Sequence, residues 1–169
     1  LLICWINFLL THLFSQSVNL DSIWINGNIP RQTTLSFIQK SGLKIDSIVK
    51  DPTMDSLNAD SLIYFGKSSF SYYIKDDICI ANTIIFDNKI SELILGSYKI
   101  TKTSTRNDLK RMFPLDCNET KPIKVFGKKE KLERCSIYIK DNHSRLWDMR
   151  IIFLFHNDRL ARIDFWEPD

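Results

Sequence analysis

The chain has little glycine and little proline. Five of each occur in 169 residues, which excludes a collagen-like or low-complexity chain. Apolar residues make up 44% and charged residues 25% of the sequence, the balance of an ordinary globular protein. This length suits one domain or two very small ones.

An excess of charge of one sign is also missing. The formal net charge is +3, whereas nucleic-acid-binding proteins usually gather many basic residues on one face. The densest basic cluster is interrupted by Glu130 and is typical of a solvated hairpin turn; it comprises Lys128, Lys129 and Lys131. We therefore expect no nucleic acid among the partners.

Long hydrophobic runs are absent after the first stretch, residues 1–14, which small polar residues follow at Ser15–Ser17. Spanning a bilayer takes about 20 residues, so this stretch predicts a secretory signal over residues 1–17, cleaved near Ser15–Ser17. A buried N-terminal helix or an uncleaved anchor are the alternatives, and only such an anchor would bring membrane contact. Cys4 follows Ile3 instead of closing the run after a small residue, so no lipoprotein anchor is predicted.

Cysteine is sparse after the signal, with Cys79, Cys117 and Cys135. Disulfides persist in the oxidising compartments that exported proteins enter. Cys117 and Cys135 form the candidate disulfide, which would stabilise the fold by about 3 kcal/mol, although spacing alone does not fix the pairing. Cys79 lies in an apolar alternation and is predicted to be a buried thiol. The Ile-, Lys-, Asn- and Ser-rich composition favours a bacterium, and therefore a periplasmic or secreted protein.

Residues for catalysis and metal binding are few. Only His143 and His156 follow the signal, and their neighbours Asp141 and Asp158 fit turns better than a metal site. The F-G-K-S-S stretch at 65–69 resembles the end of a phosphate-binding loop, but Ser61 stands where that motif requires glycine. A catalytic triad assembled from residues far apart in the chain remains an alternative. We expect no enzymatic activity, no metal and no cofactor.

A short repeat suggests the architecture. Y-I-K-D occurs at 73–76 and at 138–141, after F-G-K at 65–67 and 126–128. A helix pattern precedes each copy, within 33–42 and 103–114, and polar turns at 87–89 and 156–159 separate β-rich stretches after each. In the second helix pattern Thr105 and Asp108 fit a capping box. The fold class expected is α+β, with two tandem helix-plus-antiparallel-sheet repeats at 18–97 and 98–169 and a seam near residues 96–103.

The second helix pattern resembles the helix start of the outer-membrane assembly lipoproteins of the SmpA/OmlA (BamE) type. The residues that carry it are Thr105, Asp108, Leu109, Met112, Phe113 and Pro114. The closing stretch, residues 151–166, resembles the last hairpin of that family. Two such units in tandem is the architecture of β-lactamase inhibitor protein-like chains. The resemblance implies their fold and a non-enzymatic, protein-binding role, while the missing lipid-attachment site argues against an outer-membrane anchor.

Aromatic residues and arginine supply the candidate binding surface. Alternation places Arg162 and Trp166 on one strand face, with Ile163 and Phe165 on the other, more apolar face. Tryptophan, tyrosine and arginine dominate protein interfaces, so an open sheet face is expected to bind a protein, with the chain a monomer. The candidate residues are Trp147, Arg162, Trp166 and Tyr72. An envelope assembly factor, or a small-ligand binder or hydrolase in a cleft between the repeats, are the alternatives.

Overall fold

The computed structural model describes residues 17–50, 59–124, 131–140 and 146–166. The predicted signal segment lies outside these ranges except for Ser17, which begins the first described strand. Within the described ranges no helix is both long and apolar enough to cross a membrane.

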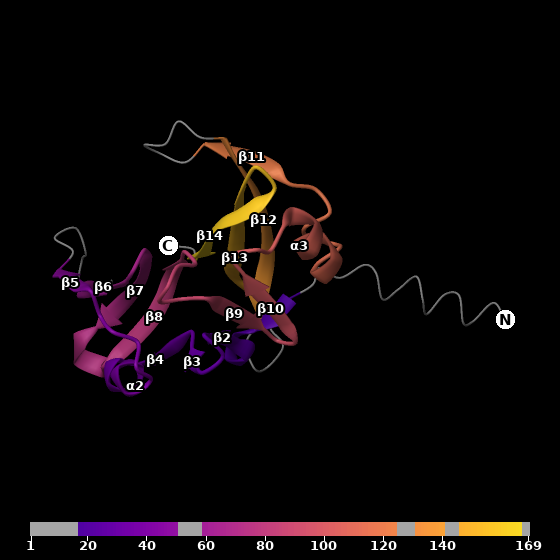
Figure 1. Cartoon of the computed structure of the whole chain (residues 1–169). Helices are drawn as coiled ribbons and strands as arrows, with labels where there is room; N and C mark the ends of the chain where they lie inside the picture. The colour runs from indigo at the N-terminus through magenta and orange to yellow at the C-terminus, as the bar shows by residue number, and fades with distance from the viewer. Residues whose placement is uncertain (1–16, 51–58, 125–130, 141–145, 167–169) are drawn as a thin grey trace.

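A ten-stranded mixed sheet forms the main layer of the molecule (Figure 1). Its strands follow the order β1-β12-β13-β14-β8-β7-β6-β5, with β11 beside β12 and β4 beside β8. All described pairs are antiparallel except β1 with β12. The strands are β1 (Ser17–Asn19), β4 (Gln32–Thr34), β5 (Ser47–Lys50), β6 (Ser61–Phe65), β7 (Ser68–Tyr73), β8 (Ile78–Ile84), β11 (Lys121–Lys124), β12 (Lys131–Lys140), β13 (Leu146–His156) and β14 (Arg159–Trp166).

A second, four-stranded sheet has the order β10-β9-β2-β3. It joins strands from near the start of the described chain to strands from its middle: β2 (Ile23–Ile25), β3 (Ile29–Pro30), β9 (Glu92–Leu95) and β10 (Tyr98–Thr101). The described helices are α2 (Leu35–Lys40), α3 (Arg106–Met112) and the 3-10 turns η1 (Leu20–Ser22) and η2 (Ile74–Asp76).

One face of the large sheet is buried beneath α3 and the second sheet. Phe113, after α3, stacks on Phe153 of β13 at 6.2 Å between ring centroids and meets Tyr98 of β10 edge-on at 5.2 Å. Direct cross-strand neighbours on this face are fully or almost fully buried: Cys135, Phe153, Ile163 and Ile84. A single apolar core therefore extends from the large sheet through α3 to the second sheet.

The expected fold class is wrong. The described chain is predominantly β, with one continuous ten-stranded sheet and a second sheet, and not two helix-plus-sheet units. The first predicted hairpin after residue 78 does not form, because β8 stays in the large sheet while β9 pairs with β2 and β10. The boundary between residues 97 and 98 falls inside the β9–β10 hairpin.

The family resemblance is wrong for the same reason. The helices that would carry it have six and seven residues, too short to form a layer of their own over each sheet. The fold therefore does not match the SmpA/OmlA type or a tandem of such units.

Several local predictions are confirmed. Both helices form inside the predicted ranges, and Thr105 and Asp108 make the reciprocal capping box. The turn between β13 and β14 has positive φ at Asn157 (49°) and Asp158 (66°), as a two-residue type I′ hairpin requires. Cys117 and Cys135 form a disulfide, and Cys79 is a buried free thiol.

Candidate functional site

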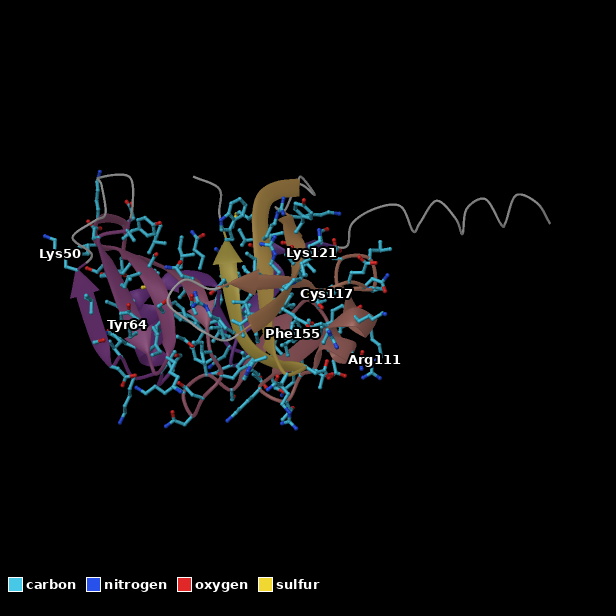
Figure 2. The ribbon with its side chains drawn as sticks, turned by 90° about the horizontal axis from the view of Figure 1, so that it is seen from above. Lys50, Tyr64, Arg111, Cys117, Lys121 and Phe155 are labelled. Carbon is cyan, nitrogen blue, oxygen red and sulfur yellow. A yellow bond between two sulfur atoms is a disulfide. The ribbon has the colours of Figure 1, made fainter. Side chains whose placement is uncertain are left out.

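The second face of the large sheet, here called the open face, is partly exposed along its whole width. Cross-strand pairing aligns one row of side chains over seven strands, and none of them is fully buried: Ser47, Tyr64, Ser69, Thr83, Asp164, Ile152 and Ser136. Figure 2 shows Lys50 and Tyr64 at one end of the sheet and Lys121 and Cys117 at the other. A broad surface is thus available between these ends.

The adjoining row on β12, β13 and β14 holds an arginine between two aromatic rings. Arg150 pairs directly with Tyr138 on one side and with Trp166 on the other. Its guanidinium carbon lies 4.6 Å from the centroid of the Tyr138 ring and 5.8 Å from that of Trp166. These distances are within the range of cation–π attraction. We call Tyr138, Arg150 and Trp166 the Arg150 cluster.

A polar network lies beside the Arg150 cluster, where the two halves of the large sheet meet. β14 and β8 share only the pairs Ile163–Ile84 and Asp164–Thr83. Thr83 Oγ1 donates to Asp164 Oδ1 at 2.9 Å, and Arg162 Nε donates to the same oxygen at 2.6 Å. Arg162 is therefore already occupied by an internal ion pair, unlike Arg150.

Two of the four predicted binding residues lie on the same face of the large sheet. Arg162 and Trp166 share the open face, and Trp166 is 45% exposed. Tyr72 lies on the covered face, paired with Cys79 and packed against the core. Burial is the main cause that raises the pKa of Tyr72, and the negative charge of Asp77 raises it further. The Tyr72 hydroxyl donates a hydrogen bond to the Asp77 carboxylate. Trp147 belongs to β13, but its side chain lies outside the described residues.

Sequence reasoning missed Arg150 and Tyr138. Alternation alone placed Arg150 on the face with Ile152 and Leu154, which gave no reason to prefer it. Arg150 is identified by the pairing register of β12, β13 and β14, which places it between Tyr138 and Trp166. That register cannot be derived from local sequence patterns, because β12 contains an irregularity between Tyr138 and Lys140.

Two surface depressions flank these features. One, of about 400 Å³, lies where the sheets meet and is lined in part by Leu95, Tyr98, Phe113 and Lys140. The other, of about 280 Å³, adjoins the Arg150 cluster. Arg150, Tyr138, Arg134 and Lys121 are among its lining residues.

The described residues offer little for catalysis. Burial raises the pKa of the Cys79 thiol to about 12, so the thiol is protonated at neutral pH and is a poor nucleophile. In the described ranges no group of three or more His, Cys, Asp or Glu side chains is arranged to hold a metal ion. His143, Asp141, Lys128 and Lys129 lie outside those ranges, and Lys131 begins β12 with its side chain outside the described residues.

The comparisons with protein-family models, curated proteins and solved structures found no match to this chain. The disulfide is consistent with an oxidising, extracytoplasmic environment.

Proposed function

We propose that this chain is an exported, non-enzymatic protein-binding module, periplasmic or secreted, that acts as a monomer through the open face. The observation that carries the proposal is the Arg150 cluster, an arginine between a tyrosine and an exposed tryptophan on the open face. These three residue types are enriched where binding energy concentrates in protein interfaces.

The surroundings of the cluster support a protein-sized contact. Next to the cluster, a row of half-exposed side chains crosses β14, β8, β7 and β6 through Asp164, Thr83, Ser69 and Tyr64. Asp164 is the one charged side chain among these four. Polar, half-buried side chains of this kind are typical of an interface rim around an aromatic centre.

Affinity capture from an extract of the producing cell tests the proposal. The baits are the wild-type protein, the double variant Arg150→Ala with Trp166→Ala, and a matched control, Lys110→Ala with Arg111→Ala on α3. We expect one stoichiometric protein partner that the control retains and the cluster variant loses. A partner that the cluster variant retains would show that the open face is not the binding site.

The depression between the sheets favours a second candidate function, small-ligand binding. Its Tyr98 and Phe113 rings meet edge to face, and Lys140 and several serines are among the polar residues that complete the lining. Aromatic walls with polar groups that orient a ligand suit a small molecule. Absence of any protein partner, together with a metabolite whose binding is lost in Tyr98→Ala, would favour this function.

A further inference from the structure

Three basic side chains at one end of the open face, Arg150, Arg134 and Lys121, form no ion pair with another described residue. We propose that the partner presents an acidic protein segment there, and that Arg150 receives one of its aspartate or glutamate carboxylates. This inference rests on the proposed function and specifies the chemistry of its partner.

Arg150 is fixed in place before any partner arrives. Its guanidinium lies between the rings of Tyr138 and Trp166, and its Nε is enclosed without a hydrogen-bond partner in the part of the chain that the structure describes. Guanidinium groups match carboxylates through paired N–H donors. An arginine already held in position loses less side-chain entropy on binding.

Two further cations stand near Arg150. Arg134 and Lys121 are direct cross-strand neighbours on β12 and β11, and both are exposed. Like charges in that arrangement repel each other, so a carboxylate between them is favoured. Both line the depression of about 280 Å³ together with Arg150. Among the described residues none of these three cations forms an ion pair.

The size and composition of the depression favour a short acidic segment of a protein over a polyanion. Asp116 and Glu119 also line it and would repel a chain of closely spaced phosphates at each step, whereas a single aspartate or glutamate carboxylate needs only Arg150. The rest of the open face, toward β6, is neutral, with Tyr64, Ser69 and Ser71. The complementary partner surface is therefore acidic over β11–β13 and uncharged beyond β8.

Peptide selection on the purified, disulfide-bonded protein tests this inference. Random twelve-residue peptides are selected at low ionic strength on wild type, and each selected peptide is paired with a twin in which Asp and Glu become Asn and Gln. Dissociation constants are then measured for wild type, Arg150→Gln, Arg150→Lys, Trp166→Leu and the control Arg111→Gln. Thermal unfolding verifies that each variant is folded.

We expect the selected peptides to be rich in Asp and Glu and to bind roughly tenfold or more tightly than their amide twins. Arg150→Gln should remove that preference, Arg150→Lys should keep part of it, and Arg111→Gln should leave it unchanged. The inference is overturned if acidic residues are not enriched, or if Arg150→Gln keeps the preference. Equal affinity for a single-stranded DNA oligonucleotide would overturn it too, since the recognition would then be of any polyanion.

The same data separate the inference from the proposed function. Weaker binding to Trp166→Leu without any preference for acid over amide would keep the binding face and reject the acidic partner. If no selected peptide is sensitive to Trp166 or Arg150, both proposals fail.

Discussion

At the scale of single residues, Gly66 explains why the F-G-K stretch that resembled a phosphate-binding loop is a structural turn. It connects β6 to β7 with φ of +62°, a conformation that glycine adopts without steric cost. Its N–H donates to Asp46 Oδ2 at 2.5 Å, and the N–H of Lys67 donates to Asp87 Oδ2 at 3.1 Å. The backbone donors of this turn are therefore occupied by the protein's own carboxylates.

Gly66→Ala is expected to lower the free energy of unfolding more than Gly42→Ala does. An added Cβ at Gly66 would overlap the Asp87 carboxylate, whereas nothing lies within 4 Å of one at Gly42 (φ +84°). Asp87 cannot easily move, because the N–H groups of Lys67, Lys89 and Ile90 all donate to it. We expect about 1 kcal/mol for the left-handed backbone at Gly42 and about 2–4 kcal/mol at Gly66. Equal losses in urea unfolding would contradict the overlap.

At the scale of elements, α3 depends on its N-terminal cap for stability. The backbone N–H of Thr105 donates to Asp108 Oδ2 at 2.9 Å, and the N–H of Asp108 donates to Thr105 Oγ1 at 3.2 Å. The Thr105 backbone hydrogen bond, assisted by the Thr105 hydroxyl and Arg111, holds the pKa of Asp108 below its ordinary value of 3.8. The stability of the short helix that precedes Phe113 therefore depends on pH.

Acidification should remove this contribution. A carboxyl group whose pKa is lower in the folded state stabilises the protein above its unfolded-state pKa, and that stability is lost as the pH falls through the folded-state pKa. We expect the free energy of unfolding of wild type to decline below about pH 4. Asp108→Asn should be less stable at pH 7 and decline less steeply. Chemical unfolding at several pH values measures both, and identical pH profiles would contradict the role of Asp108.

The disulfide stabilises the segment between α3 and β12. It closes residues 118–134 into a loop, with 5.1 Å between the Cα atoms of Cys117 and Cys135. Removing such a cross-link increases the entropy of the unfolded chain. Cys117→Ser with Cys135→Ser is expected to lose about 3 kcal/mol, measured by urea unfolding. A reductant should destabilise wild type by a similar amount and leave the double variant unchanged; a wild type insensitive to reductant would contradict the prediction.

At the scale of the whole molecule, the sequence predicted the features that residues close together in the chain determine. It did not predict which strands pair with each other. The cap at Thr105, the turn at Asn157–Asp158 and the two helices depend on residues within a few positions of each other. The placement of β9 does not, because its apolar alternation suits either sheet and its pairing with the distant β2 joins it to the second one. A bulge before Arg162 likewise places Leu160 in the core beside Phe155, where strict alternation grouped it with Arg162.

The continuity of the large sheet predicts that the chain unfolds as one unit. Residues before and after position 97 depend on each other at several places. β1 pairs with β12, β9 pairs with β10, Ile84 pairs with Ile163, and the guanidinium of Arg31 lies 4.8 Å from the centroid of the Phe165 ring. Arg31 is only 2% exposed. Separating the two halves at that position would remove a neighbouring strand from each of β1, β8 and β9 and would expose a buried arginine.

We therefore expect residues 18–97 expressed alone to lack a cooperative unfolding transition, and the complete chain to unfold in a single one. Burying apolar surface across β8 and β14 is what compensates for ordering both halves, and neither half retains that surface by itself. Circular dichroism during urea titration and the dispersion of amide NMR signals report the outcome. A well-dispersed spectrum and a sigmoidal transition for the fragment would show that the first half folds independently, as a tandem repeat would have.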